Sequence, residues 1–106
     1  MSRAAATALR LLTTLGTSAT LTSTDAATGL QTTRTAACAI VGAAKGPALP
    51  SVVVEAGDYS LLMEAGALPV DGDAVDVADL ELVVVHAAPI YDRATVAVWQ
   101  VWGRRR

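Results

Sequence analysis

The stretch "LELVVVHAAPIYDRATVAVWQVW", residues 80–102, decides the fold of this chain. It holds two valine-rich runs, Leu80–Ala88 and Ala94–Trp102, which are separated by Pro89 and the short connection "IYDR". β-Branched and aromatic side chains suit the pleated surface of a sheet, and these runs have the length of strands. The sequence therefore predicts two strands here, and they are the clearest in the chain.

The second run is apolar on both of its faces, interrupted only by Gln100. On a strand, Val96, Val98 and Trp102 point one way, while Ala97, Trp99 and Val101 point the other. A strand in a small monomer normally has one face in water. Either this strand crosses the centre of the domain or its outer face meets another subunit. The candidates for a subunit interface are Val98, Trp99, Val101, Trp102, Arg104 and Arg105.

The first 64 residues predict one helix followed by further strands. Apolar residues at three- and four-residue spacing favour a helix over residues 3–15, and Gly16 ends it, so that residues 1–16 form an N-terminal helical segment. Strands are expected over four ranges: Thr17–Thr24, Thr33–Val41, Val52–Ala56 and Tyr59–Glu64. Asp25–Gln31 is expected to be a hairpin loop.

One helix and about six closely spaced strands indicate a mainly β fold. The expected architecture is a small antiparallel β-barrel or sandwich in a single domain, residues 1–106. Its core must consist of Val, Leu and Ala, because the chain has no Phe and only two Trp and two Tyr.

A long irregular loop is expected over Gly42–Ser51, "GAAKGPALPS". Glycine and proline punctuate it, and it exceeds the ~2–5 residues of a typical hairpin loop, so we expect it to be mobile. Long loops in compact domains often carry function. The residues concerned are Gly42, Ala43, Ala44, Lys45, Gly46, Pro47, Ala48, Leu49 and Pro50.

Charge is segregated along the chain, although the net charge is only −2. Residues 1–45 carry four basic side chains and one acidic, residues 46–92 carry nine acidic and none basic, and residues 93–106 carry four arginines. Such a pattern suits head-to-tail contacts between copies or a surface that repels nucleic acid, with residues 103–106 as a basic tail.

The aspartates of "LPVDGDAVDV", residues 68–77, are interpreted as a corner between strands rather than as a site. Asp71 and Asp73 flank Gly72, and aspartate favours turns because its carboxylate binds nearby backbone N–H groups. An EF-hand loop would need a Glu at its twelfth position, where this chain has Leu82. Gly57-Asp58 is predicted to form a second structural turn.

Nothing else in the sequence indicates catalysis, a metal or a cofactor, and we expect that the protein is not an enzyme. The sole histidine, His86, shares a strand face with Leu82 and Val84, and the sole cysteine, Cys38, lies in an apolar run. No uncharged stretch reaches the ~18 apolar residues of a membrane helix. A protein without a membrane segment is therefore expected.

A monomeric small β-barrel module that binds nucleic acid or a host protein is the alternative hypothesis. Nucleic-acid-binding barrels need a basic groove interleaved with stacking aromatic residues. Here the middle of the chain is acidic and both Trp lie in an apolar strand. Only Arg104–Arg106 are therefore suited to binding phosphate groups.

The order of these features resembles the head-closure proteins, also called stoppers or head–tail connectors, of long-tailed bacteriophages and gene transfer agents. The resemblance lies in a short helix ending near a glycine, a Thr-rich strand, a "TG" loop, two "GD" turns, a valine-rich strand, a proline and a final strand ending in Arg. In this chain the matching positions are Gly16, Thr28-Gly29, Gly57-Asp58, Gly72-Asp73, Val83–Val85, Pro89 and Trp99–Arg105. One departure is that Asp79–Leu82 replaces the glycine and aromatic that often precede the valine-rich strand in that family.

The resemblance implies an architectural role in the neck of a virion that is assembled in the host cytoplasm. In that family, a ring of six or twelve copies docks beneath the head–tail adaptor protein, retains the packaged double-stranded DNA that passes through its lumen, and offers a platform to the tail-tube or tail-terminator protein. The loop that closes the channel in such proteins would correspond to Gly42–Pro50.

Overall fold

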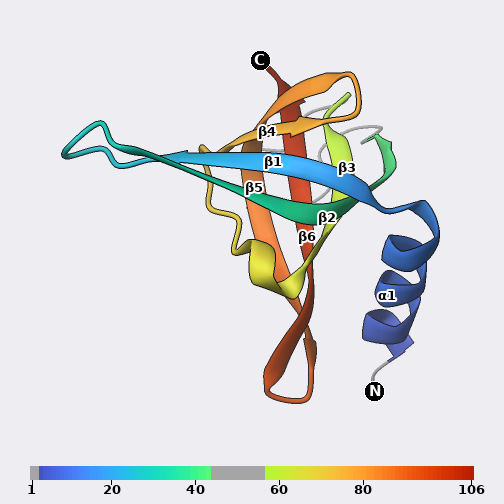
Figure 1. The fold of residues 1–106 in the computed structure, drawn as a ribbon. Coiled ribbons are helices and arrows are strands. Elements are labelled where there is room, and N and C mark those ends of the chain that lie inside the picture. Colours follow the sequence, from blue (N-terminus) through green and yellow to red (C-terminus); the bar gives the residue numbers. More distant parts are fainter. Residues whose placement is uncertain (1–2, 44–56) are drawn as a thin grey trace.

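Six antiparallel strands close into a barrel in the computed structural model, which describes residues 3–43 and 57–106 (Figure 1). The fold class predicted from the sequence is confirmed, and of the two architectures that were left open the barrel is the right one. The elements are α1 (Arg3–Leu15), β1 (Thr17–Thr24), β2 (Gln31–Ala43), β3 (Tyr59–Glu64), the 3₁₀-helix η1 (Ala65–Ala67), β4 (Ala74–Val77), β5 (Leu80–Asp92) and β6 (Thr95–Arg105).

The strands follow the order β1-β2-β3-β6-β5-β4, and β4 pairs back with β1 to complete the barrel. The closing strand, β4, is the shortest and has four residues. It lies between β1 and β5, where Val75 is opposite Leu21 on one side and Leu82 on the other. All three of these side chains are fully buried, so the closing strand is held by the packing of the barrel interior.

The pairing of β5 with β6 forms the longest hairpin and corrects the expected end of the first valine-rich run. That strand continues through Pro89, which is opposite Trp99, to Asp92, and only Arg93 and Ala94 connect it to β6. A proline has no N–H to give to a sheet, so it needs a strand edge without a partner. β5 provides one, because its pairing with β4 ends at Val83 and its later residues pair with β6 alone.

Other boundaries also differ from the expectation, since β2 begins at Gln31 rather than at Thr33. Gly42 and Ala43 belong to β2, where they pair with Ser60 and Tyr59, so the expected loop begins after them. Residues 44–51, the remainder of that loop, and the expected strand Val52–Ala56 lie outside the described residues. Residues 103–105 are also not a tail, because they are the last part of β6.

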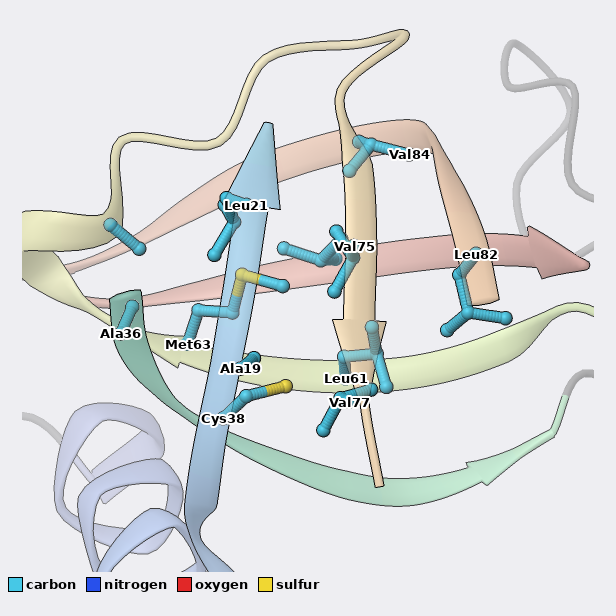
Figure 2. Close-up of a cluster of buried hydrophobic side chains, with 12 residues drawn as sticks. Ala19, Leu21, Ala36, Cys38, Leu61, Met63, Val75, Val77, Leu82 and Val84 are labelled. Atoms are coloured by element: carbon cyan, nitrogen blue, oxygen red, sulfur yellow. The ribbon is translucent and has the colours of Figure 1, made fainter. Parts of the chain in front are cut away.

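The barrel interior is filled by small and medium apolar side chains, and no aromatic side chain is fully buried there. Leu21, Leu61, Met63, Val75 and Leu82 come from four different strands and point toward one another (Figure 2). Figure 2 also shows Cys38 in this interior, contributed by β2. Unbranched methionine fills irregular gaps between branched side chains, which suits its place among these leucines and valines.

Helix α1 packs on the outside of the barrel and forms a second, smaller cluster. Ala8 and Leu12 lie against Ala39 of β2, Leu62 of β3 and Val98 of β6. Contacts within one chain therefore account for both apolar faces of β6. Val98 on its outer face lies under the helix, and Val101 on its inner face lies in the barrel. No second subunit is needed to bury either of them.

The connection from α1 to β1 should depend on Gly16. A Cβ atom at this position would lie 2.1 Å from the carbonyl oxygen of Leu12, and a backbone oxygen cannot move aside without displacing the helix. We expect Gly16→Ala to lower the free energy of unfolding by ~1–3 kcal/mol, measured by urea denaturation.

Gly66→Ala is the matched control for this substitution. Its Cβ would meet only the Glu64 side chain, at 3.8 Å, and we expect a change of less than ~0.5 kcal/mol. Equal effects of the two substitutions would show that the tight approach at Gly16 is not what makes glycine necessary there.

Candidate functional site

The only buried charged side chains among the described residues are the aspartates of the two "GD" turns. Asp58 is 3% exposed and Asp73 is 4% exposed. A buried carboxylate is costly unless it is paired and hydrogen-bonded, so each must have a specific partner. Both partners are arginines, and both come from strands that are remote in the sequence.

Asp58 forms a two-pronged ion pair with Arg104. The guanidinium donates from Nε to Oδ1 and from Nη2 to Oδ2, each at 3.0 Å. Asp58 immediately precedes β3, and Arg104 lies near the end of β6. The pair therefore ties together the first residues of β3 and the last of β6, where the two strands are neighbours. Arg104 was expected to be a subunit contact, but it is engaged within its own chain.

Arg34 and Asp73 form a second pair, which spans more of the barrel. Arg34 lies in β2, Asp73 comes just before β4, and Nη2 donates to Oδ2 at 3.1 Å. The guanidinium also donates from Nη1 to the hydroxyl oxygen of Ser23, on the intervening strand β1, at 2.8 Å. One side chain thus connects three adjacent strands. Asp73 does more than shape a corner, because it also holds the arginine that reaches across the closure of the barrel.

The same arginine fixes the segment that follows β3. Its Nε donates to the carbonyl oxygen of Ala67 at 2.8 Å, and its Nη2 donates to that of Leu68 at 3.0 Å. From the other side, Nε1 of Trp99 donates to the carbonyl oxygen of Ala65 at 3.0 Å. Three backbone carbonyls of this segment, those of Ala65, Ala67 and Leu68, therefore accept hydrogen bonds from two side chains, and Trp99 has a structural role inside its own chain.

A third ion pair joins Arg106 to Asp76 of β4, and the Arg106 N–H donates to the carbonyl oxygen of Glu81 at 3.0 Å. With Arg34 and Arg104, three arginines from the basic ends of the chain thus pair with aspartates of its acidic middle. Much of the charge segregation seen in the sequence is used to hold this fold together.

The remaining interface candidates are placed as follows. Val98 and Val101 are fully buried in this chain, so they cannot offer a surface to another subunit. Trp102 is half-buried on β6, opposite Ser60 of β3 and His86 of β5. Arg105 is exposed, and it remains the candidate most open to a partner.

The other residues with reactive side chains do not gather into a site. Cys38 is fully buried, and this burial raises the pKa of its thiol to about 12. His86 is half-buried in the middle of β5. Among the residues that the structure describes, no group of three or more His, Cys, Asp or Glu is placed to hold a metal ion. Within the same residues, no helix is long and apolar enough to cross a membrane.

Among the described residues, Leu15, Leu30 and Tyr91 are exposed apolar side chains that lie apart, and the other large ones form two groups on the surface. Leu68 and Val70 follow η1 and are 62% and 60% exposed. Leu11 of α1 and Val41 of β2 line an open groove of about 540 Å³ between the helix and the barrel. The sequence could not assign these residues to a surface, because their exposure depends on how the helix and the 3₁₀ segment dock on the barrel.

The comparisons with known proteins place this chain in no family. No family model, no curated protein and no solved structure matches it.

The buried ion pair at Asp73 gives a direct test of the interactions described above. Asp73→Asn removes the charge that faces Arg34 and should lower the free energy of unfolding by ~1–3 kcal/mol, measured by urea denaturation. The exposed Asp71, two residues earlier, is the matched control, and Asp71→Asn should change it by less than ~0.5 kcal/mol. Equal small effects would mean that Asp73 contributes no more than a turn residue.

Cys38 gives a second test, of the barrel interior. Burial and the raised pKa of the thiol both leave little reactive thiolate at neutral pH, so iodoacetamide should not modify the folded protein. The same reagent should alkylate the protein fully in concentrated urea, as measured by intact mass. Rapid alkylation under native conditions would show that the barrel opens readily.

Proposed function

We propose that this chain is a structural subunit of a virion, forming a ring at the head–tail junction of a long-tailed bacteriophage or a gene transfer agent. In this role the ring docks on the adaptor protein at the portal side, helps to retain packaged double-stranded DNA and receives a tail-tube or tail-terminator protein on its other side. The order of sequence motifs described above is the first support for this proposal.

The single structural observation that carries the proposal is the exposed apolar surface at two separate places on a closed barrel. Monomers rarely leave large apolar side chains gathered at the surface, and such groups usually mark contacts with other proteins. Leu68 and Val70 form one group, and Leu11 and Val41 belong to the other. A ring subunit needs two different contact surfaces, one for each neighbour.

The exposed acidic side chains are consistent with a channel for DNA. Asp79 and Glu81 are exposed just after β4 and at the beginning of β5. Phosphates repel a surface of this sign, so a lumen wall that carries these residues would let DNA slide past without binding to it.

Deleting the coding sequence from the genome that produces the particles tests the proposal. We expect heads that package DNA but carry no tails, and that lose their DNA to added nuclease sooner than complete particles do. Electron microscopy and the fraction of nuclease-resistant DNA measure the two effects, and supplying the chain in trans should restore both.

Tailed particles that form at normal yield without this chain would contradict the proposal. So would tight binding of the purified chain to labelled duplex DNA at physiological salt, measured by fluorescence anisotropy. That result would favour a module that recognises nucleic acid, whereas a subunit of a DNA channel should bind duplex DNA only weakly.

A further inference from the structure

The three residues Leu68, Pro69 and Val70, which we name the apolar hook, present their side chains in an unusual way. Leu68 and Val70 are 62% and 60% exposed, whereas Pro69 between them is buried. Leu68 also has a backbone φ of +46°, in the left-handed region that residues other than glycine rarely adopt. A strained backbone that holds a leucine in water is retained only where the surroundings impose it, and such strain is found most often at functional positions.

The surroundings of the hook do impose this conformation. Arg34 binds the carbonyl of Leu68, and the Asp73 carboxylate accepts a hydrogen bond from the Val70 N–H at 3.0 Å. The Asp73 N–H in turn donates to the Val70 carbonyl oxygen at 3.0 Å. The backbone of the hook is thus bound to the barrel while two of its side chains point to solvent. Because the backbone of the hook is already fixed in this way, a contact made through it loses little backbone conformational entropy on binding.

The second apolar surface is the groove between α1 and the barrel, which we name the helix groove. Its volume of about 540 Å³ lies within the roughly 300–1,000 Å³ of surface clefts that bind ligands, and it is open to solvent. Leu11, Val41, Leu62 and Ile90 contribute apolar lining, and Arg3 lies at it as well. Arg3 is the one charged side chain among the described residues that line the groove, so the charge there is positive.

The two surfaces complement each other in charge and in position. The exposed carboxylate of Asp71 directly follows the hook, and the exposed Arg3 lines the groove. In Figure 1 the segment after η1 and helix α1 lie on opposite sides of the barrel. A hook and a groove on opposite sides cannot meet within one molecule, but they can meet between successive molecules of a ring.

We propose that the apolar hook of one copy docks in the helix groove of the next copy, with Asp71 of the first facing Arg3 of the second. Leu68 and Val70 fill the apolar part of the groove, and the ion pair sets the orientation. This contact is heterologous, so its repetition gives a ring when the rotation between successive copies closes, which the proposed ring function requires. The inference rests on the proposed ring function and names the surfaces through which the ring forms.

Disulfide trapping between two variants of the full chain, each with one added cysteine, tests the contact. Val70→Cys places a thiol on the hook, Thr7→Cys places one at the groove, and the native Cys38 is fully buried and stays unreactive. A mixture of the two variants should give a covalent dimer under mild oxidation, at least tenfold more than Thr7→Cys mixed with Thr28→Cys, whose exposed site lies in the turn between β1 and β2.

Charge reversal tests the proposed ion pair independently. Asp71→Arg and Arg3→Asp should each weaken self-association at least tenfold, measured by sedimentation equilibrium over a range of concentrations. Combining the two should restore it, because the charges are then exchanged. Asp79→Arg, at another exposed acid, should leave the association unchanged. Circular dichroism and thermal unfolding show whether each variant is folded.

The outcomes separate this inference from the proposed function. If a ring forms, but the two cysteine variants give no covalent dimer and neither charge reversal weakens the association, the hook-and-groove contact is wrong. The ring function would not be affected by that result. A chain that stays monomeric at every concentration and gives no covalent dimer would overturn the contact as well. The proposed ring function is tested separately, by whether particles from the deletion strain carry tails.

Discussion

Closure of this barrel depends on a four-residue strand, and Arg34 is the side chain that holds the strand's beginning in place. From β2 it reaches past Ser23 of β1 to Asp73, immediately before β4. Beyond the end of β6, Arg106 reaches Asp76 within β4. Both ion pairs reach past the direct neighbours of β4. Arg34 lies on β2, beyond β1, and Arg106 follows β6, beyond β5. A core of leucine, valine and alanine buries less area than an aromatic one, so these polar links matter more here than in a larger domain.

The ion pairs also change how the charge pattern of the sequence should be understood. Basic ends and an acidic middle suggested contacts between copies, but three of the arginines are matched within one chain. The charges that remain open to partners are fewer and more specific, and Arg3 and Asp71 are examples.

The fold class could be predicted because it depends on local patterns, whereas the site depends on pairings between distant residues. The runs Thr17–Thr24 and Tyr59–Glu64 were placed with their observed bounds, since a threonine-rich run and a short apolar run between turn residues are each visible within eight residues. The end of β5 was misplaced, because whether a strand tolerates Pro89 depends on which neighbour is present at that point. The partners of Asp58 and Asp73 lie 46 and 39 residues away, and nothing near either aspartate identifies them. A lone arginine inside the uncharged run "TTRTAA" was the only signal for the second pair.

The pairing of β1 with β4 has a consequence for synthesis of the chain on the ribosome. Residues 19–22 pair with residues 74–77. One edge of β1 therefore lacks its hydrogen-bonding partner until more than fifty further residues have been synthesised. During that interval β1 and β2 form a hairpin with an open border that could recruit another nascent chain. β1 is rich in threonine and serine, whose hydroxyl groups keep this strand edge hydrated. Valines in the same places would favour aggregation. Its composition thus serves the growing chain as well as the finished barrel.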